Sequence, residues 1–74
     1  MKVKVKLFAT LQKDRFKMRE LEFDESITVA EVCRKLGIPR KKVSIIFVNN
    51  THAGHDRPLE EGDELALFPP IGGG

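Results

Sequence analysis

The ten residues TVAEVCRKLG, at positions 28–37, carry the signals of a short amphipathic helix at both ends and along one face. Thr28, followed three residues later by Glu31, matches a capping box, in which each side chain accepts a hydrogen bond from a free backbone N–H of the other residue. The apolar side chains with the spacing of one helical face are Val29, Val32, Cys33 and Leu36. Gly37 supplies the left-handed residue at which helices commonly end. Such a helix buries one face only, so the rest of the chain is expected to supply a sheet for it to cover.

Four stretches around this helix have the composition of β-strands, and they span residues 2–8, 16–23, 43–49 and 64–68. The first and the last alternate apolar with polar side chains and are expected to be buried on one face. In the second the alternation fails between Met18 and Leu21, so a bulge or an early end is expected there. The third is almost continuously apolar, which predicts a strand buried on both faces or nearly so. Turn-forming residues fill positions 49–54, and Leu59 in the connection that follows is expected to point inward.

The order of these elements is a β-hairpin, a helix, a strand, a connection and a last strand. The economical way to bury one sheet face under one helix is to place the last strand beside the first. The expected fold is therefore α+β, a β-grasp roll with a mixed sheet covered on one face by the helix. Residues 1–68 would form the domain, and residues 69–74 an extended, flexible C-terminal tail.

Length, charge and cysteine content exclude several classes of protein. A chain of 74 residues has little room for an enclosed active site. The net charge of +2 and the lack of aromatic residues among the basic clusters give no signal for nucleic-acid binding. No apolar run approaches the length of a membrane span, and the first residues lack the features of a signal peptide. One cysteine, Cys33, excludes an internal disulfide and fits a reducing compartment, so a cytoplasmic location is expected.

The C-terminal sequence FPPIGGG, at positions 68–74, is unusual for the end of a small domain. Pro69 and Pro70 stop the preceding strand and favour an extended spacer. Glycine has no Cβ, so a glycine terminus can enter a narrow channel and be attacked without steric obstruction. A flexible end without function is the alternative interpretation of these glycines.

Together with KVKLFATL near the start and VNN…HDRPLEEGDELALFPP near the end, this tail resembles the ubiquitin-like sulfur carriers of prokaryotes, the MoaD/ThiS group. The likeness is strongest to the carriers that serve as small subunits of molybdopterin synthases, and it extends over essentially the whole chain. Those carriers have two prolines, two spacer residues and a terminal diglycine. Ile71 and Gly72 match the spacers, and Gly73 and Gly74 match the diglycine.

The resemblance implies that a partner enzyme, and not this chain, supplies the catalysis. An E1-like adenylating enzyme would use ATP to activate the carboxylate of Gly74, and sulfur from a cysteine desulfurase or a rhodanese would replace AMP to leave a thiocarboxylate. The large molybdopterin synthase subunit would then use this sulfur to build the dithiolene of the molybdenum or tungsten cofactor. No permanently bound cofactor and no metal site are expected. Three alternatives stay open: sulfur transfer to thiamine thiazole, conjugation to lysines as a ubiquitin-like modifier, and a non-covalent interaction module with an inert tail.

Phe8 and Phe68 are expected on the sheet face away from the helix, on neighbouring strands. Two exposed aromatic side chains beside a reactive tail would form a docking surface for the activating enzyme and the synthase. The residues expected to bind partners are Phe8, Phe68, Pro69, Pro70, Ile71 and Gly72. The alternative is that the two phenylalanines only cover the edge of the core.

The remaining candidate side chains are expected to have structural or solvated roles. Cys33 is expected to be a buried small hydrophobe of the helix. His52 and His55 suggest a metal site, but without a third ligand they are expected to be solvated.

Overall fold

The computed structural model describes residues 1–71, so the predicted roles of Gly72, Gly73 and Gly74 lie outside the described residues. The described chain forms five strands, one α-helix and two short 3-10 helices. Their bounds are β1 Lys2–Leu7, η1 Ala9–Gln12, β2 Met18–Glu22, α1 Val29–Lys35, η2 Arg40–Lys42, β3 Ile45–Val48, β4 Thr51–His52 and β5 Glu64–Phe68.

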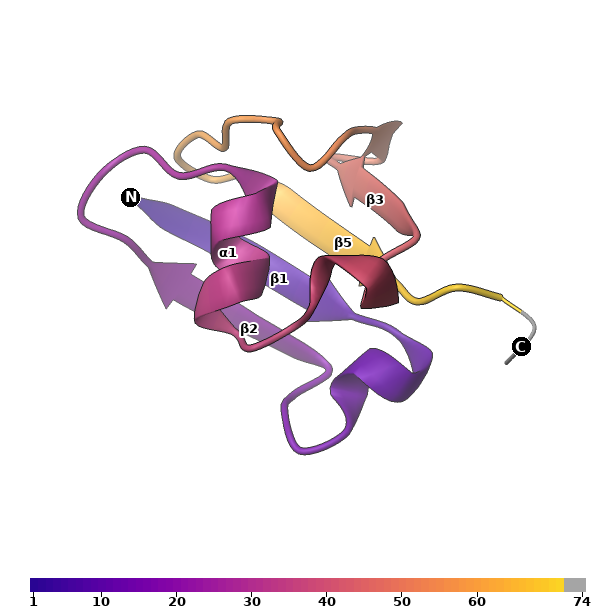
Figure 1. Ribbon diagram of the computed structural model, residues 1–74. Helices are drawn as coiled ribbons and strands as arrows, with labels where there is room; N and C mark the ends of the chain where they lie inside the picture. The colour runs from indigo at the N-terminus through magenta and orange to yellow at the C-terminus, as the bar shows by residue number, and fades with distance from the viewer. Residues whose placement is uncertain (72–74) are drawn as a thin grey trace.

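The strands form one mixed sheet in the order β2-β1-β5-β3-β4. The central pair β1 and β5 is parallel, and the other neighbours are antiparallel. Helix α1 lies across one face of this sheet, while the opposite face carries no helix (Figure 1). The fold is thus the ubiquitin-like β-grasp, which confirms the predicted fold class.

The core lies between α1 and the covered face of the sheet. The alternating apolar residues of each strand point to this face, as the two-residue period of a strand requires. The fully buried side chains of greatest volume are Leu7, Leu59, Leu65, Leu67, Val3, Val5, Val29, Val32 and Val48. Leu59 lies in the irregular connection before β5, so its predicted inward position is confirmed.

The predicted capping box begins α1. The Thr28 Oγ1 accepts a hydrogen bond from the Glu31 backbone N–H at 3.3 Å, and the Glu31 Oε1 accepts one from the Thr28 backbone N–H at 2.9 Å. The hydrogen bond from the Thr28 backbone is the main cause that lowers the pKa of the Glu31 carboxyl. Because folding lowers this pKa, the hydrogen bonds of the Glu31 carboxylate stabilise the fold at pH values above the ordinary pKa of a glutamate. This stabilisation is lost as the pH falls through the lowered value.

Replacement of Thr28 by alanine is expected to destabilise the fold by about 1 kcal/mol, because a backbone N–H at the start of the helix loses its acceptor. Urea denaturation of Thr28→Ala and of the unchanged chain, followed by circular dichroism, measures this difference. Thr28→Ser keeps the hydroxyl and serves as the matched control. Equal midpoints for all three proteins would contradict the capping role.

Arg15 holds the other end of α1 from a distant part of the chain. Its guanidinium donates to the carbonyl oxygens of Leu36 at 3.2 Å and Gly37 at 3.0 Å, and also to that of Leu11 at 3.3 Å. The last carbonyls of a helix have no partner within the helix and carry partial negative charge, so a guanidinium stabilises them. The connection between β1 and β2 is thereby attached to the C-terminal end of α1.

Two local expectations about the strands were wrong. No bulge interrupts β2, because its register with β1 is continuous from Met18 opposite Lys6 to Glu22 opposite Lys2. The alternation fails because β2 is an edge strand, on which Met18 is 54% exposed on the face without a helix. Strand β3 is not buried on both faces: Ile46 and Val48 are buried, whereas Ile45 and Phe47 stay partly exposed.

The segment predicted as a turn at 49–54 also contains strand β4, which the sequence analysis missed. Asn49 and Asn50 both have positive φ, 53° and 66°, as the two-residue turn of a tight hairpin requires. The Asn49 side chain donates to the Asp63 Oδ1 at 2.9 Å and accepts from the Glu64 backbone N–H at 2.9 Å. The hairpin is therefore attached to the start of β5.

Candidate docking surface and C-terminal tail

The parallel pairing of β1 and β5 places Phe8 beside Phe68. Leu7 lies opposite Leu67 in the register, so the next residue of each strand meets its counterpart on the face without a helix. The two rings are stacked, with centroids 4.2 Å apart and planes 11° from parallel. The Phe8 backbone N–H also donates to the Leu67 carbonyl at 3.2 Å. The structure thus brings together the two aromatic residues that the sequence analysis selected.

A third aromatic residue, Phe47 on β3, completes this surface. Phe47 lies opposite Ala66 in the register of β3 and β5, and its ring meets the Phe68 ring edge to face, with centroids 5.8 Å apart. His52 of β4 meets the other side of Phe47, with centroids 5.1 Å apart. We call Phe8, Phe47 and Phe68 the aromatic patch. The sequence analysis missed Phe47 because it expected both faces of this strand to be covered. The signal that could have found it is its position two residues after Ile45, which puts both side chains on the same face of the strand.

A shallow depression of about 260 Å³ lies over the patch and is lined by Lys6, Phe8, Phe47, Asn50, Glu64, Ala66 and Phe68. The Lys6 Nζ and a Glu64 carboxylate oxygen, 3.0 Å apart, form an ion pair at its border. All three rings are only partly exposed. An apolar centre bordered by charged groups is the arrangement found in protein–protein interfaces.

The chain leaves the sheet directly beside the aromatic patch. Strand β5 ends at Phe68, the Pro69 side chain is partly buried, and Pro70 is exposed. Ile71 is 89% exposed, which is unusual for a large apolar side chain. The described part of the tail therefore extends an apolar surface away from the domain.

Comparison with known proteins identifies the family. A model of the ThiS family matches residues 5–74, which include the whole C-terminal sequence. The chain belongs to the ThiS family. A 27-residue stretch is 56% identical to the molybdopterin synthase sulfur carrier subunit of Escherichia coli (strain K12); it covers 36% of this chain and 33% of that relative. The curated relative is thus matched over about a third of its length.

Two solved structures show the same fold. The crystal structure of SAMP1 from Haloferax volcanii superposes with a TM-score of 0.76, at 25% identity and over 100% of both chains. The complex of subunits 1 and 2 of the molybdopterin-converting factor from Helicobacter pylori 26695 contains a chain that superposes with a TM-score of 0.65, at 22% identity and over 100% of both chains. The fold of this ThiS-family chain therefore occurs in a solved subunit complex.

Cys33 and His55 line one pocket of about 280 Å³, but no hydrogen bond among residues 1–71 joins them. The prediction that His55 is solvated was wrong for its Nδ1 atom, which is buried without a hydrogen-bond partner among the same residues. Cys33 is only 2% exposed, and its burial raises the pKa of the thiol, so the thiol is a poor nucleophile. Among residues 1–71, no group of three or more His, Cys, Asp or Glu side chains could hold a metal ion. No helix in the same residues is long and apolar enough to cross a membrane.

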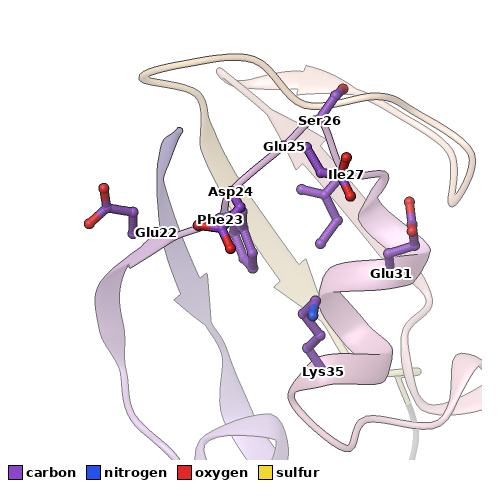
Figure 2. Close-up of a pocket in the computed structure, with 8 residues that line it drawn as sticks. All are labelled: Glu22, Phe23, Asp24, Glu25, Ser26, Ile27, Glu31 and Lys35. Carbon is purple, nitrogen blue, oxygen red and sulfur yellow. The ribbon is translucent and has the colours of Figure 1, made fainter.

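A cleft of about 380 Å³ lies between the connection from β2 and helix α1, and its lining includes no residue of the aromatic patch (Figure 2). Its lining residues are Glu22, Phe23, Asp24, Glu25, Ser26, Ile27, Glu31 and Lys35. The Glu31 carboxylate is engaged by Thr28 in the capping box. The cleft contains neither a histidine nor a cysteine.

Proposed function

We propose that this ThiS-family chain is a sulfur carrier for molybdopterin synthesis. The observation that carries the proposal is the family match, which runs to Gly74, in a chain whose aromatic patch lies where the tail leaves the sheet. The name of the Escherichia coli relative supports the molybdopterin pathway. The pterin itself would be recognised by the large synthase subunit, because no enclosed pocket of the described chain combines groups suited to bind it.

The chemistry would take place at the carboxylate of Gly74. A carboxylate is a poor electrophile. An E1-like enzyme would activate the carboxylate by joining it to the α-phosphate of ATP, with release of pyrophosphate. The terminal sulfur of a persulfide on a cysteine desulfurase or a rhodanese would then attack the carbonyl carbon, and AMP would leave with the electron pair of the C–O bond. A second thiol would reduce the S–S bond of the resulting acyl disulfide, which would free the thiocarboxylate and leave a disulfide on the donor. Gly73 and Gly74 place no Cβ near this carbon, so the nucleophile can approach it.

The aromatic patch and the tail would bind the partners. Apolar and aromatic side chains at the centre of an interface supply most of its binding energy. Phe8 and Phe68 would anchor both the activating enzyme and the large synthase subunit, with Phe47 extending the contact. Pro69, Pro70, Ile71 and Gly72 would span the channel that leads to the partner's active site. The Helicobacter pylori complex, which joins subunits 1 and 2 of the molybdopterin-converting factor, supports a large subunit as one of these partners.

Intact-mass spectrometry of the protein purified from its native host tests the proposal. Replacement of one carboxylate oxygen by sulfur raises the mass by about 16 Da, and treatment with a thiol-selective alkylating reagent should label the new group. Cys33→Ser should give the same increase, which would exclude oxidation of the cysteine to a sulfenic acid, a change that also adds about 16 Da. An unchanged mass after incubation with the adenylating enzyme, ATP and a sulfur donor would contradict the proposal.

Conjugation to other proteins is the second candidate, and the likeness to SAMP1, whose name denotes a small archaeal modifier protein, favours it. Both functions begin with adenylation of Gly74, so the tail alone does not distinguish them. Isopeptide adducts between Gly74 and lysines, detected by peptide mass spectrometry, would support the modifier. Sulfur delivery to a thiazole precursor would instead assign the chain to thiamine synthesis.

Phe68→Ala is expected to weaken binding to the large synthase subunit about 30-fold, or about 2 kcal/mol, because the ring lies at the centre of the aromatic patch. The loss of stability should be smaller, about 1 kcal/mol, because the ring is partly exposed and lies on the face of the sheet away from the core. Isothermal titration calorimetry measures the first effect, and urea denaturation measures the second.

Thr28→Ala is the matched control for this experiment, since it should cost a similar amount of stability at a site away from the patch. Normal binding by Thr28→Ala and weak binding by Phe68→Ala would assign the effect to the patch. Unfolding of Phe68→Ala, or equal binding by both variants, would show that the phenylalanine only supports the core.

A further inference from the structure

The charged side chains are separated between the two ends of the molecule. Residues 9–17 and 38–44 contain six basic side chains and one acidic one, Asp14. The six basic residues, which we call the basic end, are Lys13, Arg15, Lys17, Arg40, Lys41 and Lys42. The rest of the chain holds the other seven basic residues and the other ten acidic residues of the 13 and 11 in the sequence. Although the net charge of the chain is small, its excess of positive charge is therefore concentrated in these two segments.

The fold gathers these two segments at the end where the tail leaves. The first segment follows β1, which is parallel to β5, so it begins where β5 ends. The second contains η2 and reaches Ser44, whose backbone N–H donates to the Phe68 carbonyl at 2.8 Å. Arg15 joins the segments through its hydrogen bonds to the C-terminal end of α1. In Figure 1 the turn after β1, the short helix before β3 and the start of the tail lie at the same end of the sheet.

Three residues of the basic end line a groove together with Asp14, and no ion pair within residues 1–71 includes any of the six. The groove has a volume of about 630 Å³ and lies between the η1 connection and the segment after α1; Lys13, Arg15 and Lys42 are among its lining residues. Five of the six side chains are exposed, and Arg15 is partly buried. The ion pairs among residues 1–71 join Lys6 to Glu64 and the N-terminus to Glu61, and neither includes a residue of the basic end.

We propose that the basic end binds an acidic surface on the protein that receives the C-terminal tail. This inference rests on the proposed function, since it assumes that a partner accepts the tail. Unpaired like charges close together repel one another, and a surface of opposite charge removes that cost. Because the basic end adjoins both the aromatic patch and the tail, a partner that covers the patch reaches these charges at the rim of the same interface.

The position of the charges indicates what they contribute. Charges at the rim of an interface mainly raise the association rate and orient the encounter, while buried aromatic residues determine how slowly the complex dissociates. Glu22 and Glu61 lie beside Lys2 at the start of β1, the end of the sheet away from the tail, which we call the acidic end. These residues strengthen the orientation, because a partner with an acidic surface repels them. The molecule would therefore approach its partner with the tail in front.

An acidic protein surface fits these features better than a nucleic acid does. The basic segments contain one aromatic residue, Phe16, and the Arg19 guanidinium lies over its ring at 4.7 Å from the centroid. The basic segments themselves therefore offer bases no free aromatic ring on which to stack.

Stopped-flow measurement of association with the large synthase subunit of the same organism tests the proposal. The variant is the double reversal Lys41→Glu and Lys42→Glu, and the matched control is Lys2→Glu and Arg57→Glu, which changes the net charge equally at exposed positions elsewhere. At about 0.03 M salt the first variant should associate roughly tenfold more slowly than the unchanged chain, and the control less than about twofold. At about 0.5 M salt the three rates should converge, because the charges are screened.

Equal rates for the two variants, or a rate for the unchanged chain that does not depend on salt, would overturn the inference while leaving the sulfur-carrier proposal intact. Absence of any complex at either salt concentration would instead contradict the proposed function. Binding of a labelled single-stranded RNA, lost in Lys41→Glu/Lys42→Glu, would assign the basic end to nucleic acid. Salt-sensitive dimerisation in light scattering would assign it to the acidic end of a second copy.

Discussion

Deletion of Gly73 and Gly74 is expected to abolish sulfur transfer while leaving the stability of the domain unchanged. The shortened chain still ends in a glycine, Gly72, so the chemistry of the terminal carboxylate is preserved. Its reach, however, falls by about 7 Å, the length of two extended residues. A misplacement of about 1 Å at a reacting centre can cost about a hundredfold in rate, so activity should fall to background.

The measurement is molybdopterin formation in a reconstituted reaction with the adenylating enzyme, ATP, a sulfur donor and the large synthase subunit. Gly72→Ala is the matched control, because this residue is the expected spacer and most activity should remain. Full activity of the deletion variant would contradict the sulfur-carrier proposal. Loss of activity in Gly72→Ala but not in the deletion variant would show that the reaction depends on Gly72 and not on Gly73 and Gly74. Thermal unfolding should be the same for all three chains, since the core residues lie between Val3 and Leu67.

Leu67→Ala is expected to have the largest effect on stability. Leu67 is fully buried on β5, opposite Leu7 of β1 and Ile46 of β3, so its removal leaves a cavity under the centre of the sheet. Such truncations cost about 2–5 kcal/mol. A domain of this size has a total stability of about 4–11 kcal/mol, so the variant could lose half of it. The expected decrease in Tm is about 10–25 °C.

Differential scanning calorimetry measures this decrease, and Leu67→Met is the control. Methionine preserves most of the volume at the same site, so its cost should stay below about 1.5 kcal/mol. The adjacent Phe68→Ala should also unfold at a higher temperature than Leu67→Ala, because the two side chains lie on opposite faces of β5. A Tm for Leu67→Ala within a few degrees of the unchanged chain would contradict the placement of Leu67 in the core.

The parts of the fold that depend on neighbours in sequence were predictable. The capping box of Thr28 and Glu31 and the alternation of β5 both arise within a few residues, and the structure confirms both. The parts that depend on distant partners were harder to predict. Leu11 is buried in η1, a helical turn that the sequence analysis did not predict, because this turn directs its side chain toward the core. Strand β4 forms only because Asn49 and Asn50 adopt positive φ and turn the chain back along β3.

The candidate site was likewise predictable only where it depends on neighbours in sequence. The sequence selected Phe8 and Phe68 because alternation in two strands placed them on the same face, and the FPPIGGG sequence marked the tail. It did not include Phe47, because the strand of Phe47 is almost continuously apolar and only its pairing with β5 shows which face stays uncovered. The sequence analysis also did not identify the basic end, because its two segments are separated by about twenty residues that include the helix.

By itself, the sequence determined the four longer strands and the helix, most of the side chains that they bury, and the proline- and glycine-rich segment that follows the last strand. These features follow from local periodicity, capping and the chemistry of single residues. Only the tertiary structure decided which surfaces lie together at the tail. The antiparallel pairing of β3 with β5 adds Phe47 to the aromatic patch, and the parallel pairing of β1 with β5 places Phe8 beside Phe68, with the basic end next to them. This pairing joins residues some sixty positions apart, and its energy comes from a core that no single segment can form alone.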